Sequence, residues 1–165
     1  MKRRLIVRIA LLVLIVALMT TIFILSHQPA DISSEVSGGL IYRALNFIMS
    51  GFDSLTETQR AELVESLQYF VRKCAHAFSY ALLGGLLMGL MATFDYEKLI
   101  KATRPAFAIA FLYSVTDEVH QLFVAGRSGQ VSDVLLDSAG AICGILIVML
   151  FIYLVRKRRL KKKLK

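Results

Sequence analysis

The chain has 165 residues, which is the length of a single domain. Hydrophobic residues make up 56% of the sequence and its mean hydropathy is +0.62, which excludes an ordinary soluble globular protein and indicates a membrane protein. The net charge of +8 lies mostly in the terminal segments rather than on a folded basic face. It therefore favours contact with anionic lipid headgroups over nucleic-acid binding.

Apolar segments of membrane-crossing length occur four times along the chain. At a rise of about 1.5 Å per residue, a helix of about 20 residues crosses a hydrocarbon core of ~30 Å. The sequence therefore predicts an all-α integral membrane four-helix bundle, a single domain over 1–165, with spans at about 5–25, 74–94, 105–124 and 133–155. The first segment is longer than the apolar part of a cleavable signal peptide, so we expect an uncleaved anchor.

A mostly polar segment, residues 26–73, separates the first two predicted spans and has helical patterns of its own. Apolar residues recur within it at the spacing of one helix face: Leu40, Ile41, Leu45 and Ile48. This pattern predicts an amphipathic helix lying on the membrane surface. Further on, Thr56 and Gln59 have the spacing of a capping box. No Pro or Gly interrupts the next 20 residues, so we expect a helix that begins outside the membrane and continues into the second span.

Charge predicts the orientation of the spans. The tail 156–165 carries eight basic residues and the short loop 95–104 carries three, whereas residues 26–70 carry six acidic and two basic residues. Basic segments stay in the cytoplasm. We therefore expect a multi-pass protein with both termini and the loop 95–104 inside, and with segment 26–73 and the hairpin 125–132 outside.

Under this topology every span brings its polar residues to one level near the outer surface. Intramembrane ionisable residues normally face the interior of a bundle and pair with each other. Two arginines, Arg72 and Arg127, are expected to neutralise some of the carboxylates there. The predicted outward-facing cavity contains Ser26, Gln28, Arg72, His76, Tyr80, Asp117, Glu118, Gln121, Arg127, Asp133 and Asp137.

Small residues predict where the second and fourth spans touch. Ala81, Gly85 and Gly89 follow each other at intervals of four residues, and so do Gly140 and Gly144. This spacing allows helix backbones to approach closely in lipid.

Three motifs resemble those of the VanZ-like family of bacterial membrane proteins. They are "SHQPADISS" after the first span, "RKCAHAFSYALLG" in the second, and "YSVTDEVHQLFVAGRSGQVSDVLLDSAGA" across the last two. The resemblance extends over the whole chain and is strongest over 72–84 and 113–140. It implies a protein of the bacterial cytoplasmic membrane and cell envelope, in a family whose named member is linked to teicoplanin resistance. It implies no reaction.

The residues leave several functions open. The pair Asp117–Glu118 either fixes helix register as a buried ion pair or serves a ligand. The preferred hypothesis is binding of an anionic lipid-linked or peptidoglycan-related ligand by the two arginines. The alternative is a membrane hydrolase in which His76 and a carboxylate exchange protons with a lipid or cell-wall precursor. A purely structural partner of another membrane protein is a third reading. Nearby arginines disfavour a metal site, and no cofactor is expected.

Overall fold

The computed structural model describes residues 2–94 and 99–163, and every regular element in these residues is a helix. In chain order they are α1 (Lys2–Ser26), α2 (Ala30–Ile48), the short 3-10 helix η1 (Phe52–Ser54), α3 (Glu57–Met91), the 3-10 helix η2 (Leu99–Ala102), α4 (Thr103–Gln121) and α5 (Val131–Lys163). The all-α prediction is confirmed for this part of the chain. Residues 95–98 of the predicted inner loop and 164–165 of the predicted tail lie outside the described residues.

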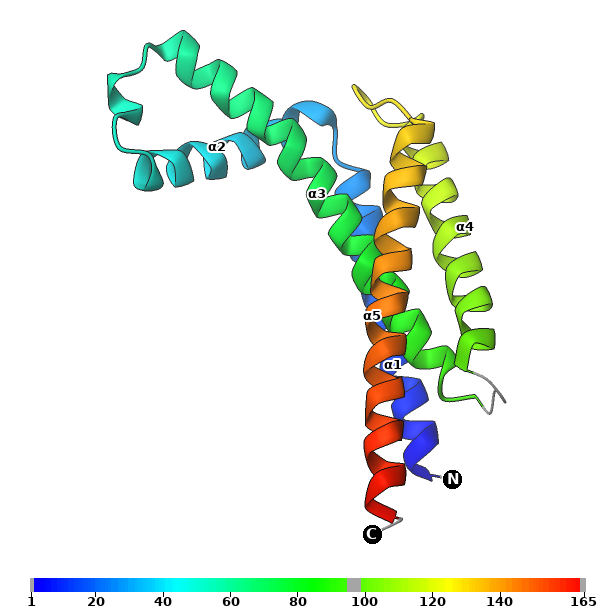
Figure 1. The fold of residues 1–165 in the computed structure, drawn as a ribbon. Helices are drawn as coiled ribbons and strands as arrows, with labels where there is room; N and C mark the ends of the chain where they lie inside the picture. Colours follow the sequence, from blue (N-terminus) through cyan, green and yellow to red (C-terminus); the bar gives the residue numbers. More distant parts are fainter. Residues whose placement is uncertain (1, 95–98, 164–165) are drawn as a thin grey trace.

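Three of the described helices, α1, α3 and α5, are long and apolar enough to cross a membrane. The third predicted span, 105–124, corresponds to α4, which has 19 residues but carries three charged side chains, Arg104, Asp117 and Glu118. Because of these charged side chains, α4 is less suited than α1, α3 and α5 to contact lipid, and its carboxylates need to face the neighbouring helices. It packs beside α3 and α5 in the bundle (Figure 1).

The segment between the first two spans forms a helical hairpin. Its second helix, α3, begins with the predicted capping box: the Thr56 hydroxyl accepts from the Gln59 N–H, and the Gln59 side chain accepts from the Thr56 N–H. α3 then continues without a break for 35 residues into the apolar bundle, as predicted. The first helix, α2, begins nearer to α1 than its apolar pattern indicated. Gly51 permits the turn between them, because its φ of +92° is disfavoured for other residues.

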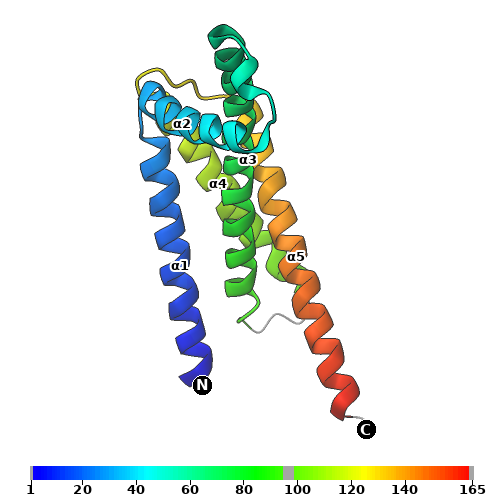
Figure 2. The same cartoon turned by 90° about the vertical axis from the view of Figure 1, so that its left-hand side faces the viewer.

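The two ends of the molecule differ in character. The start of α1 and the end of α5 lie together at one end, and α2 and the loop between α4 and α5 lie at the other (Figures 1 and 2). Near the terminal end Arg8 donates from Nε to the Thr93 hydroxyl at 2.9 Å and lies 4.2 Å above the Phe94 ring. This contact joins the basic start of α1 to the residues that follow α3.

The core of the bundle is apolar and draws on α1, α3, α4, α5 and η2. Its buried members are Ile15, Ile22, Tyr80, Leu83, Leu87, Met88, Leu90, Ala102, Ala106, Ala110, Ala141 and Ile145. Most large apolar side chains of α1 and α5 instead point outward and are exposed. An apolar outer surface around an apolar core is typical of a protein whose solvent is lipid.

The backbones of α3 and α5 touch at the predicted small residues. A Cβ atom added to Gly144 would lie 2.7 Å from the carbonyl carbon of Ala81, and one added to Gly140 would lie 3.0 Å from that of Ala77. Real Cβ contacts are longer than these distances, so only glycine fits at either position.

Two details of that contact differ from the sequence prediction. Gly89 faces Leu11 of α1 instead of α5. Gly84, which the four-residue spacing did not single out, lies against Ala141, where an added Cβ would come within 2.9 Å of the Ala141 Cα. The rotation of α3 about its own axis decides which of its small residues face α5. The four-residue spacing does not specify that rotation.

Candidate functional site

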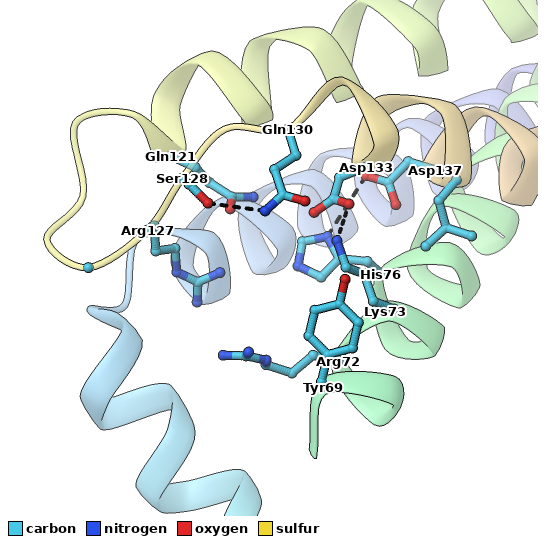
Figure 3. Close-up of a pocket in the computed structure, with 12 residues that line it drawn as sticks. Tyr69, Arg72, Lys73, His76, Gln121, Arg127, Ser128, Gln130, Asp133 and Asp137 are labelled. Atoms are coloured by element: carbon cyan, nitrogen blue, oxygen red, sulfur yellow. Dashed lines mark hydrogen bonds and ion pairs between the residues drawn. The ribbon is translucent and has the colours of Figure 1, made fainter. Parts of the chain in front are cut away.

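A polar cavity of about 130 Å³ opens at the end of the bundle that carries the α4–α5 loop (Figure 3). It lies between α3, the beginning of α5 and that loop. Its lining residues are Tyr69, Arg72, Lys73, His76, Gln121, Gly126, Arg127, Ser128, Gln130, Asp133, Leu136 and Asp137. Six of the eleven predicted site residues are among them. We call this space the polar cavity.

A second cavity of about 150 Å³ lies between the end of α1 and α3. It contains two more predicted residues, Ser26 and Gln28, and shares Arg72, His76 and Arg127 with the polar cavity. The rest of its lining is Ile22, Leu25, Ser33, Ala75 and Ser79. We call it the apolar cavity, because α1 and Ala75 contribute hydrocarbon side chains to it.

The Arg127 guanidinium is fastened to the end of α1. It donates from Nε to the Gln28 carbonyl at 2.9 Å and from Nη2 to the Leu25 carbonyl at 3.1 Å. Carbonyl groups in the last turn of a helix have no partner within the helix, so they attract such donors. Burial and then the neighbouring Arg72 guanidinium lower the pKa of Arg127 from its usual value.

Neither of the two arginines forms a direct ion pair with a carboxylate among the described residues, although the charges of Asp117 and Glu118 act on Arg127 from farther away. Arg127 donates to carbonyls, and Arg72 reaches the Ser34 hydroxyl at 3.5 Å from its Nη1 atom. Neither guanidinium has a carboxylate within 4.0 Å in the described part of the chain. Figure 3 shows both of them turned toward the polar cavity.

One carboxylate of the cavity is neutralised by a lysine that the sequence reading did not single out. Lys73 forms an ion pair with Asp133, and both side chains are about four-fifths buried. The signal was present in the motif "RKCAH", in which Lys73 follows Arg72. Adjacent residues lie about 100° apart around a helix, so only the rotation of α3 determines which one meets α5.

A histidine and a second carboxylate form the back of the polar cavity. The Nδ1 atom of His76 lies 3.8 Å from Oδ2 of Asp137. Asp137 is fully buried, and neither of its carboxylate oxygens has a hydrogen-bond partner among the described residues. His76 keeps 28% of its side chain exposed and lines both cavities.

Two predicted site residues lie behind the cavities rather than in their walls. Asp117 is buried and accepts a hydrogen bond from the Ser26 hydroxyl at 3.0 Å on Oδ2, while its Oδ1 has no partner in the described part of the molecule. Tyr80 is fully buried and its hydroxyl has no described partner either. Ser26 lines the apolar cavity, so this hydrogen bond links Asp117 to a residue of the cavity wall.

Glu118 has a structural contact that explains its burial. Its carboxylate accepts the backbone N–H of Gln130 at 2.8 Å and the Gln121 side chain at 3.3 Å. Gln130 immediately precedes α5, where backbone N–H groups have no helical partner. Glu118 therefore holds the α4–α5 loop and the start of α5 in place.

The neighbouring His120 points away from both cavities. Its Nε2 atom lies 3.1 Å from Nδ1 of His27, and its ring stacks on Phe23 with the centroids 4.5 Å apart. These contacts join the end of α1 to the end of α4. No group of three or more His, Cys, Asp or Glu side chains is placed to hold a metal ion in the described part of the chain.

The fold and the cavities define the class of the protein. Three membrane-capable helices, with a polar cavity at the end opposite the basic termini, indicate a helical membrane protein. The chain belongs to the VanZ/LLP1 family, whose family model matches residues 11–152. No curated protein and no solved structure matches the chain.

Proposed function

We propose that the protein binds the anionic, phosphate-bearing headgroup of a membrane lipid or lipid-linked cell-envelope precursor in the polar cavity. The observation that carries the proposal is the pair Arg72 and Arg127, which face one space from two different elements without a carboxylate partner among the described residues. Guanidinium groups bind phosphate through paired N–H donors.

The charges around the cavity favour an anion. Asp133 is already neutralised by Lys73, and Asp137 lies beside His76. The charges of Asp117 and Glu118 act on Arg127 from farther away, and no described carboxylate forms an ion pair with either guanidinium group. Two cations held close together repel each other, so an anion between them removes an unfavourable interaction as well as adding hydrogen bonds.

The second cavity indicates that the anion belongs to an amphiphile. It shares Arg72 and Arg127 with the polar cavity and continues toward Ile22 and Leu25 of α1. A phosphate held by the two arginines therefore has hydrocarbon on one side and polar side chains on the other. A lipid or lipid-linked molecule has that division of polarity within one ligand.

The proposed orientation in the bacterial cytoplasmic membrane has four spans, α1, α3, α4 and α5, with both termini in the cytoplasm and the cavities facing outward. Basic residues at the terminal end of the molecule support it. α4 crosses as part of the bundle because its two carboxylates turn inward and are buried.

A reporter enzyme that is active only outside the cytoplasm tests this orientation. It is expected to be active when inserted near Asp53, in the turn between α2 and α3, and inactive when fused after Lys165. The opposite pattern would place the cavities on the cytoplasmic side and remove the envelope precursor as a ligand.

The ligand is tested by titrating detergent-solubilised protein with phosphatidylglycerol and, separately, with a polyprenyl monophosphate. Arg72→Gln is expected to weaken binding of the preferred ligand about tenfold to a hundredfold, the effect of losing a hydrogen bond to a charged group. Arg72 is the better position to change, because Arg127 also holds α1 to the loop.

The matched control is Arg43→Gln, which removes the same charge from an exposed position on α2. We expect its affinity to equal that of the wild type. Equal losses in the two variants would show general attraction to a basic protein and contradict a specific site. Tighter binding of the lipid or of the polyprenyl phosphate distinguishes the two sources of the phosphate.

A further inference from the structure

His76 lies beside the two arginines of the proposed phosphate site. It lies one helical turn after Arg72 on α3, and it lines both cavities together with Arg72 and Arg127. Residues four positions apart on a helix present their side chains on the same face. The imidazole is therefore next to any anion that the guanidinium groups hold.

Asp137 fixes the way in which that imidazole can react. Its Oδ2 atom faces Nδ1, which favours the tautomer with the proton on Nδ1 and leaves the lone pair on Nε2. Figure 3 shows the ring with one nitrogen toward Asp137 and the other toward the cavity. The 3.8 Å separation is long for a hydrogen bond, and contacts of this kind commonly tighten when a substrate binds.

The burial of Asp137 is otherwise unexplained by the fold. It is fully buried, and both carboxylate oxygens have no hydrogen-bond partner among the described residues. A buried carboxylate costs free energy that a neutral residue of the same size would avoid. A carboxylate that orients a histidine base has a reason to be kept.

The proton donors in the cavity wall limit which leaving group the site can expel. Expelling an alkoxide from a phosphate monoester requires an acid, and Lys73, the ammonium group in the cavity wall, is occupied by Asp133. A phosphate leaving group departs without a proton, because it is stable as an anion at neutral pH. The cavity therefore suits the terminal phosphate of a diphosphate.

From these contacts we infer that the protein hydrolyses a lipid-linked diphosphate to the lipid monophosphate and inorganic phosphate, with His76 as general base and Asp137 as its positioning residue. The inference rests on the proposed function, since it requires the phosphate to be held by Arg72 and Arg127. Nε2 of His76 takes a proton from water as the water oxygen bonds to the terminal phosphorus. The bond from that phosphorus to the bridging oxygen breaks, and its electron pair stays on the lipid phosphate. The imidazolium then releases the proton to solvent.

The test is phosphate release from farnesyl diphosphate by the full-length protein in detergent, with binding of the same compound measured on the same preparations. The wild type is expected to release one phosphate per molecule. His76→Asn and His76→Gln should lower kcat at least about a hundredfold, the usual contribution of a general base. Asp137→Asn should lower kcat with KM unchanged, whereas Arg72→Gln should raise KM.

Each other result contradicts a defined part of the inference. Binding without phosphate release by the wild type overturns hydrolysis and leaves the proposed ligand site standing. Failure to bind farnesyl diphosphate overturns the hydrolysis, and the proposed ligand site fails only if phosphatidylglycerol and the polyprenyl monophosphate are not bound either. Equal release from phosphatidic acid overturns the choice of a diphosphate, and full activity in folded His76→Gln overturns the role of His76. An Asp137→Asn variant that loses kcat and affinity together would contradict a positioning role.

Discussion

Gly144→Ala is expected to lower the melting temperature of the purified protein more than any other single-methyl addition in the bundle. The new Cβ would meet the Ala81 carbonyl group, whose carbon atom lies 2.7 Å from its ideal position. That neighbour is backbone and cannot rotate away, so α3 and α5 must separate. Overpacking of this kind costs about 1–3 kcal/mol and occasionally more. α3 and α5 form the main contact of the bundle, which places the effect at the upper end.

The matched control for this prediction is Gly39→Ala on the exposed side of α2. No atom lies within 4 Å of a Cβ added there. Because alanine favours a helix over glycine by about 0.8–1.0 kcal/mol, this change should be neutral or slightly stabilising. Thermal unfolding in detergent, followed by circular dichroism, gives both values. If the two variants melted at the same temperature, the close approach of α3 and α5 would be refuted.

Asp137→Asn is expected to have the opposite effect and raise the melting temperature. The change removes a buried charge whose oxygens have no hydrogen-bond partner among the described residues, and it preserves the shape of the side chain. Replacing buried charges by neutral groups is often stabilising by about 1–4 kcal/mol. His76 loses a neighbour but keeps access to the cavity, so no second charge is left buried. Asp117→Asn should act in the same direction, since an amide oxygen can still accept from Ser26.

This prediction separates a functional carboxylate from a structural one. If Asp137 mainly joined the helices, its loss should cost the roughly 3–5 kcal/mol of a broken buried pair. Asp133→Asn provides the comparison, because Asp133 is ion-paired with Lys73 and partly exposed. Because both side chains of that pair are about four-fifths buried, breaking it leaves Lys73 largely buried without its partner and should lower stability by more than about 1 kcal/mol. A gain in stability for Asp137→Asn together with a loss of phosphate release is the combination expected of a residue kept for function.

The sequence by itself determined the features that depend on local pattern. Hydropathy and length located α1, α3 and α5, because a membrane-crossing helix must satisfy its backbone within one apolar segment. Thr56 and Gln59 located the start of α3, because a capping box involves only neighbouring residues. Small residues located the contact between α3 and α5, and the ionisable residues located the polar end of the bundle.

Only the tertiary structure decided which of those polar residues meet. The sequence suggested that Arg127 would neutralise a carboxylate, but the path of the α4–α5 loop brings it to the carbonyl groups at the end of α1. The rotation of α3 presents Lys73 to Asp133 and leaves Arg72 facing the cavities. A rotation of 100° separates those two neighbours, and no local pattern specifies it. Gly140 and Gly144 let α5 approach α3 closely, and in that contact α3 presents Lys73 to Asp133 and Arg72 to the cavities.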